Sequence, residues 1–74
     1  MPLVDVQVIE GVFDAQQKAE MIKRVTDAMV SIEGENMRGV TWVRVTEVKS
    51  GQWGIGGNPL TAEAVRKMAA GTAD

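Results

Sequence analysis

The residue with the most distinctive chemistry is Pro2, which directly follows Met1 in the opening run MPLVDVQVIEG. If Met1 is removed, Pro2 carries a free secondary amine at the end of the chain, and this amine takes up a proton near neutral pH. If Met1 stays, the same nitrogen is an amide with no basic lone pair. Removal of Met1 would therefore make Pro2 a candidate general acid and base.

The rest of the composition offers few other groups for acid–base or nucleophilic chemistry. The chain has no cysteine and no histidine, which excludes disulfides, thiolate nucleophiles, zinc sites built on these residues and histidine catalysis. The remaining bases are carboxylates, four lysines and the terminal amine. We therefore expect no metal and no cofactor, and the terminal amine becomes the leading candidate base.

Charge and hydropathy exclude two classes of partner. The formal net charge is −2, the sequence pI is about 5.0, and the eight basic residues are scattered. A basic footprint for nucleic acid or for an anionic membrane surface is absent. The N-terminus has no basic segment followed by a long apolar run, and no stretch approaches the length of a membrane-spanning helix. We expect a cytoplasmic protein with no nucleic-acid and no membrane partner.

Two strands and one helix are predicted to position these groups. Valines alternate with polar residues from Leu3 to Ile9, which is the period of two typical of a strand. A capping box at Asp14 predicts a helix from about residue 14 to 33. Its apolar positions at helical spacing are Ala15, Ala19, Ile22, Val25, Met29 and Ile32. The run VTWVRVTEV, residues 40–48, predicts the second strand.

The fold class predicted from this order is α/β, in one domain over residues 1–74. A strand, a helix and a strand form a βαβ unit with two parallel strands. The run KSGQWGIGGNP predicts no more than a tight hairpin, and LTAEAVRKMAAGTAD predicts a short helical turn and a frayed tail. One helix covers only one face of such a sheet, so a second subunit must cover the other. We therefore expect assembly through the sheet.

An ordered set of short motifs resembles the 4-oxalocrotonate tautomerase family over nearly the whole chain. The motifs are MP before the first strand, IEG at its end, DAQQK at the helix start, VRVTEV in the second strand and GQWGIGG after it. The resemblance implies a βαβ protomer and a hexamer built as a trimer of dimers. It also implies an amino-terminal proline, here Pro2, as general base in keto–enol tautomerisation of small 2-oxo acids.

Two departures from the family pattern concern substrate binding. An arginine typically follows the EG of the first strand, and here that place is Val12. A second arginine, in the middle of the second strand, matches Trp42 instead. Arg44 projects from the same strand face as Trp42, about 6–7 Å further along, and is the candidate substitute. The alternative is that Arg44 only forms a surface ion pair with Glu47 or Asp5.

Trp53 falls where the family places an aromatic side chain that walls the pocket, although it could also be a core or interface residue. We therefore predict a tautomerase for 2-oxo acids and 2-hydroxy-dienoates, with Pro2 catalytic and Arg44, Trp53 and Trp42 binding the substrate. Apolar surface at Val12 and Trp42 favours a monocarboxylate with an apolar tail. The alternative is a non-catalytic or half-active subunit of a mixed oligomer, in which another chain supplies the missing arginines.

Overall fold

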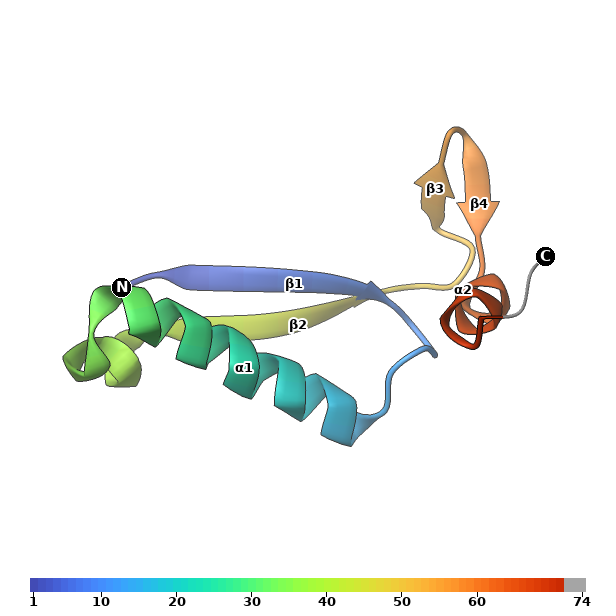
Figure 1. The fold of residues 1–74 in the computed structure, drawn as a ribbon. Coiled ribbons are helices and arrows are strands. Elements are labelled where there is room, and N and C mark those ends of the chain that lie inside the picture. The colour runs from blue at the N-terminus through green and yellow to red at the C-terminus, as the bar shows by residue number, and fades with distance from the viewer. Residues whose placement is uncertain (72–74) are drawn as a thin grey trace. The chain divides into compact units, whose positions relative to one another are not determined.

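The βαβ unit predicted from the sequence is confirmed. In the computed structural model, which describes residues 1–71, strands β1 and β2 are neighbours in a two-stranded parallel sheet (Figure 1). Backbone bonds at both ends of this pair run from Trp42 N to Pro2 O, at 3.0 Å, and from Glu10 N to Val48 O, at 2.7 Å. The elements are β1 (Leu3–Ile9), α1 (Ala15–Glu33), the 3-10 helix η1 (Glu35–Val40), β2 (Trp42–Val48), β3 (Trp53–Ile55), β4 (Asn58–Leu60) and α2 (Ala62–Ala69).

The described chain divides into two compact units. The first contains residues 1–6 and 15–46, so it holds α1, η1 and the first part of each long strand. The second contains residues 7–14 and the chain from Glu47 onward, so it holds the strand ends, the turn after β1, the short hairpin and α2. The predicted frayed tail, residues 72–74, lies outside the described residues.

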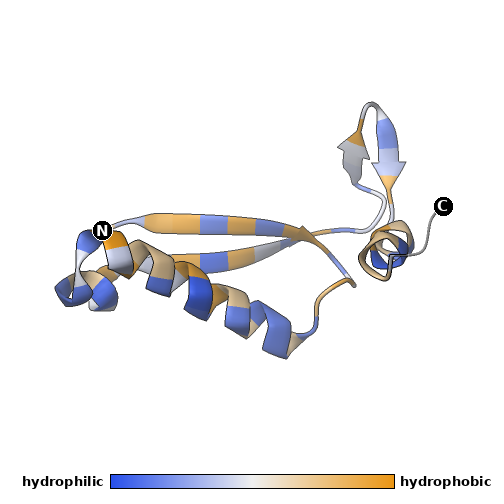
Figure 2. Ribbon diagram, in the orientation of Figure 1, coloured by the Kyte–Doolittle hydropathy of each residue, from blue (hydrophilic) through white to orange (hydrophobic). Residues whose placement is uncertain are grey.

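Along the two strands of the first unit, hydrophobic and hydrophilic residues alternate (Figure 2), and half-buried positions alternate with exposed ones. The half-buried face carries Val4, Val6, Val43 and Val45, and α1 contributes the buried Val30 to this unit. The open face carries exposed residues at the intervening positions: Leu3, Asp5, Trp42, Arg44 and Thr46. This alternation follows from the strand period of two, and it leaves large apolar side chains without a covering layer.

The apolar stripe of α1 is displaced from the one predicted. Ile22 and Ile32 are exposed, at 39% and 84% of their surface, whereas Met21 is half-buried and Val30 is buried. Apolar residues occupy neighbouring positions along this helix, so at 3.6 residues per turn two adjacent stripes fit the same sequence. Packing against the sheet selects the stripe that contains Met21, Val25, Met29 and Val30.

A short 3-10 helix, which the sequence analysis did not predict, joins α1 to β2. Gly34 follows α1 with a φ of +103°, a conformation that side chains other than glycine rarely adopt. Arg38 in η1 then donates hydrogen bonds to Asp27 of α1 and to Glu35, both at 2.8 Å. This network fixes the connection and delays the start of β2 to Trp42.

In the second unit, the glycine-rich segment forms a complete antiparallel hairpin followed by a helix. Trp53 pairs with Leu60 and Ile55 with Asn58, and the two central glycines have φ values of +59° and +83°. Two successive positive φ values produce the turn that suits a tight hairpin. Thr61 then caps α2 by accepting a hydrogen bond from the Ala64 amide, at 3.2 Å. The predicted helical turn is thus a helix of eight residues.

Candidate functional site

Pro2 lies at the start of β1, in the first unit, and is half-buried. Its carbonyl oxygen accepts the hydrogen bond from the Trp42 amide, so Pro2 is held to β2 by its carbonyl and not by its nitrogen. Met1 is exposed over 75% of its surface. Removal of Met1 would therefore leave the β1–β2 pairing intact while it frees the amine.

Arg44 and Trp42 share the open face of the first unit, as the strand period predicted. The Arg44 guanidinium lies 3.4 Å from a carboxylate oxygen of Asp5, and Thr46 donates a hydrogen bond to the other oxygen at 2.9 Å. The pair with Asp5, one of the two surface partners considered from the sequence, is therefore observed. The Arg44 side chain is 65% exposed, and such an ion pair contributes about 0–1 kcal/mol. A substrate carboxylate can compete for this guanidinium.

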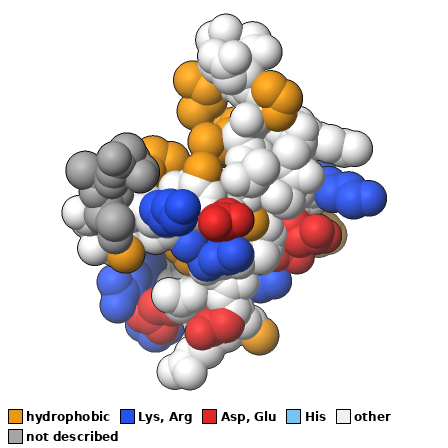
Figure 3. Space-filling model, turned by 90° about the vertical axis from the view of Figure 1, so that its right-hand side faces the viewer, with side chains coloured by type: hydrophobic (Ala, Val, Ile, Leu, Met, Phe, Trp, Pro, Cys, Tyr) orange, Lys and Arg blue, Asp and Glu red, His pale blue; other side chains and the backbone are white. Residues whose placement is uncertain are grey.

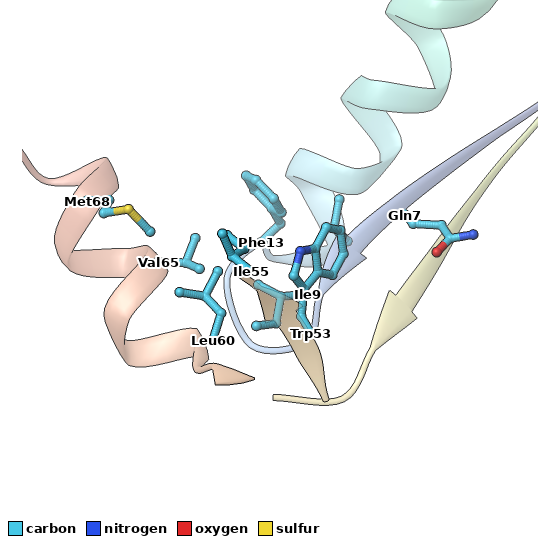
Figure 4. Close-up of a pocket in the computed structure, with 9 residues that line it drawn as sticks. Gln7, Ile9, Phe13, Trp53, Ile55, Leu60, Val65 and Met68 are labelled. Atoms are coloured by element: carbon cyan, nitrogen blue, oxygen red, sulfur yellow. The ribbon is translucent and has the colours of Figure 1, made fainter. Parts of the chain in front are cut away.

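Trp53 lies in the wall of a pocket of about 320 Å³ in the second unit (Figure 4). Apolar side chains from the end of β1, the following turn, the hairpin and α2 form most of the lining. Among the described residues that line it, Gln7 is the one outside the hydrophobic types. The lining residues are Gln7, Val8, Ile9, Phe13, Trp53, Ile55, Leu60, Val65 and Met68. Contact between Trp53 and a substrate stays a prediction, and so do the substrate roles of Trp42 and Arg44.

Arg66 and Phe13 are residues near this pocket that sequence reasoning missed. Arg66 Nη1 donates a hydrogen bond to the carbonyl oxygen of Gly11, at 2.7 Å. The turn that contains Gly11 also carries Val12, which is half-buried and provides no charge where the family pattern has an arginine. In the sequence, the apolar residues Val65 and Met68 are three positions apart. This spacing could have indicated which side of α2 faces the pocket.

Arg38 is the most strongly engaged cation of the described chain. Its hydrogen bonds lower the pKa of both the Asp27 and the Glu35 carboxyl groups, and these two partners raise the pKa of Arg38 in turn. All three groups are exposed, so solvent screens the interaction. Acidic and basic side chains are interspersed on the face shown in Figure 3. Because Arg38 bonds to Glu35 in η1 and to Asp27 in α1, it holds η1 against α1.

The chain is similar in sequence and in fold to known tautomerases. The family model described as tautomerase enzyme matches residues 2–63. The chain is 36% identical over 61 residues to a probable tautomerase of Dickeya dadantii, covering 82% of this chain and 90% of that protein. It is 40% identical over 58 residues to 2-hydroxymuconate tautomerase of Pseudomonas putida, covering 77% of this chain and 87% of that protein.

A solved structure agrees with the sequence matches. One of the 4-oxalocrotonate tautomerase isozymes from Methylibium petroleiphilum superposes with a TM-score of 0.69 at 31% identity, covering 86% of this chain and 97% of that one. The chain belongs to the tautomerase family, and the resemblance found in its motifs is confirmed. Membership supports an isomerase activity. No helix within residues 1–71 has the length and apolar character needed to cross a membrane.

Proposed function

We propose that the protein is a keto–enol tautomerase of small 2-oxo acids and 2-hydroxy-dienoates, with Pro2 as general acid and base after Met1 is removed. The observation that carries the proposal is the family match, which begins at Pro2 and includes both long strands and α1. The lack of histidine and cysteine adds support, because few other groups in the chain can move a proton near neutral pH.

The proposed reaction moves one proton between oxygen and carbon. The neutral Pro2 amine removes the proton from the enol oxygen, the carbon–oxygen double bond forms, and the electron pair moves to carbon. The protonated amine then returns the proton to that carbon, so atoms and charge balance. An apolar environment favours the neutral amine and lowers its pKa, while the proline ring fixes the direction of the lone pair.

Arg44 is proposed to bind the substrate carboxylate and the neighbouring carbonyl oxygen. A cation at this place stabilises the negative charge that develops on oxygen during proton transfer. Its position supports this role, because Arg44 lies on the same open strand face as Trp42, and the Trp42 amide is bonded to Pro2. Trp42 and Trp53 are proposed to provide apolar surfaces for the rest of the substrate.

We predict that kcat/KM is higher for phenylenolpyruvate than for 2-hydroxymuconate. The reason is the lining of the Trp53 pocket, which is mostly apolar over the part of the chain that the structure describes. A phenyl ring gains free energy in such a lining, whereas a second carboxylate loses its hydration. Initial rates with both substrates under identical buffer conditions provide the measurement. The opposite ranking would contradict a preference for apolar tails.

The proposed assembly is a homohexamer of single-domain protomers in the cytoplasm. Support comes from the open sheet face, where Leu3 and Trp42 are exposed over 55% and 59% of their surfaces. A chain of 74 residues buries little apolar surface on folding, so leaving such a face exposed to water would cost a large part of its stability. We predict a hexamer mass by native mass spectrometry of the protein expressed alone. A monodisperse monomer would contradict this, and hexamers formed only with a co-expressed homologue would favour the mixed-oligomer alternative.

A further inference from the structure

The start of α2 is held by two hydroxyl groups, one local and one from a distant part of the chain. Thr61, directly before the helix, accepts a hydrogen bond from the Ala64 amide at 3.2 Å. A local cap of this kind reaches the second or third amide of a helix, so the first amide needs another acceptor. Ser50 Oγ is that acceptor, at 2.9 Å from the Ala62 amide nitrogen and twelve residues away in sequence. Ser50 therefore links the start of α2 to the turn after β2.

The turn that carries Ser50 has a defined backbone geometry. The Gln52 amide donates a hydrogen bond to the Lys49 carbonyl at 2.9 Å, and Gly51 between them has a φ of +86°. Glycine suits this positive φ at the third position of a four-residue turn. The Gly51 amide also donates to the carbonyl of Leu60, at 3.0 Å. The turn thus holds the end of β4 through its backbone and the first residue of α2 through its side chain.

The first residue of α2 is in a buried position. Ala62 is exposed over 7% of its surface, and a Cβ atom added at Gly11 would lie 3.4 Å from the Ala62 Cβ. A buried amide that loses its acceptor costs free energy, because water does not replace the bond. Without the Ser50 hydroxyl, the start of α2 would have to move outward until water reaches the Ala62 amide.

Such a movement would change the Trp53 pocket. Val65 and Met68 of α2 and Leu60, at the end of β4, are among the residues that line this pocket (Figure 4). Ser50 is not among the described lining residues, so its effect on the pocket would pass through α2.

We propose that Ser50 is a positioning residue for the Trp53 pocket, whose hydroxyl fixes the place of α2 and so the affinity of the pocket for an apolar or aromatic group. The inference rests on the proposed function only in taking that group as part of the substrate. Thr61 differs from Ser50 in its role, because its bond lies within the first turn of α2 and ties the helix to no other segment.

The test compares two hydroxyl deletions that differ in what they link. Ser50→Ala and Thr61→Ala each remove an acceptor from one α2 amide, so both should lower the thermal stability. Binding of 3-phenylpropan-1-ol, an uncharged aromatic probe, is followed by NMR at the Met68 methyl group. We expect Ser50→Ala to weaken probe binding by roughly 3- to 10-fold. Thr61→Ala, and Ser50→Thr, which keeps the hydroxyl, should bind the probe as the wild type does.

Four results would overturn the inference. The first is failure of the wild type to bind the probe, and the second is unchanged binding in Ser50→Ala. The third is an equal loss in Ser50→Ala and Thr61→Ala, which would show that affinity follows helix stability and not helix position. The fourth is a loss in Ser50→Thr as large as that in Ser50→Ala, which would show that the hydroxyl is not the group responsible.

The wild-type protein provides a second test that holds even if Ser50→Ala does not fold. Coupling between two equilibria is reciprocal, so a ligand that binds better when α2 is in place must also stabilise the bond between Ser50 and Ala62. Saturation with the probe should therefore slow hydrogen exchange of the Ala62 amide. Unchanged exchange of this amide at saturation would contradict the proposal.

The probe cannot be turned over, so its binding is independent of proton transfer by Pro2. Probe binding that depends on Ser50 in a protein without tautomerase activity would support the positioning role and contradict the proposed function. Tautomerase activity that depends on Pro2, together with unchanged probe binding in Ser50→Ala, would support the proposed function and contradict the role of Ser50.

Discussion

Protein that keeps Met1 is expected to lose nearly all tautomerase activity, by about 10²- to 10⁴-fold relative to protein that begins at Pro2. The reason is that acylation by Met1 converts the Pro2 nitrogen into an amide without a basic lone pair. The fold should not change, because Pro2 bonds to the Trp42 amide through its carbonyl oxygen. Any loss of activity can then be assigned to the nitrogen itself.

The comparison can be made on one batch of protein. Protein expressed with methionine aminopeptidase inhibited is treated afterwards with the purified aminopeptidase, and intact mass and kcat/KM are followed on the same samples. Activity should rise in proportion to the fraction of chains that have lost Met1. As a control, Pro2→Ala provides a primary amine at the same place and should keep reduced activity. Equal activity with and without Met1 would exclude Pro2 as the base.

Replacement of Arg44 by alanine is expected to raise the barrier measured by kcat/KM by about 2–4 kcal/mol, the range for loss of a group that stabilises a developing oxyanion. Arg44 is 65% exposed and its contact with Asp5 is long, at 3.4 Å, so the guanidinium can turn to a substrate without a large loss of stability. Steady-state kinetics with phenylenolpyruvate, together with native mass, provide the measurement.

Two control variants separate a substrate role of Arg44 from a structural one. Arg24→Ala removes another exposed, ion-paired arginine and should leave kcat/KM unchanged. Asp5→Asn breaks the same pair as Arg44→Ala but keeps the guanidinium, so it should keep activity. If Arg44 serves only its pair with Asp5, the two variants will behave alike. An Arg44→Ala protein that stays assembled and fully active would also contradict the substrate role.

Local patterns predicted the elements of the fold because each element has its own period. The valines of β1 alternate strictly, and the segment after Asp14 has apolar residues at helical spacing, so both elements and their parallel order followed. The local patterns did not predict the displaced apolar stripe of α1 or the 3-10 helix η1. The stripe depends on which of two adjacent apolar rows meets the sheet, and η1 depends on the contact of Arg38 with Asp27 across eleven residues.

The candidate site likewise contains residues that could be predicted from the sequence and residues that could not. Pro2 could be predicted because its chemistry depends only on its place at the chain end, and Trp53 because of the motif around it. Arg66 could not be predicted, since it meets Gly11 across 55 residues and only the folded hairpin and α2 bring the two together. The partner of Arg44 was likewise one of two alternatives until the pairing of β1 with β2 placed Asp5 beside it.

The most direct test of Pro2 as the base is a pH titration of its nitrogen in the protein without Met1. The amine of ¹⁵N-labelled Pro2 is titrated by NMR, and kcat/KM is measured over the same pH range. We predict an amine pKa below the usual range of about 7.7–8.0 for a terminal α-amino group, and a fall in kcat/KM at low pH with the same pKa. A rate that stays constant while the Pro2 amine becomes protonated would contradict its role as the base.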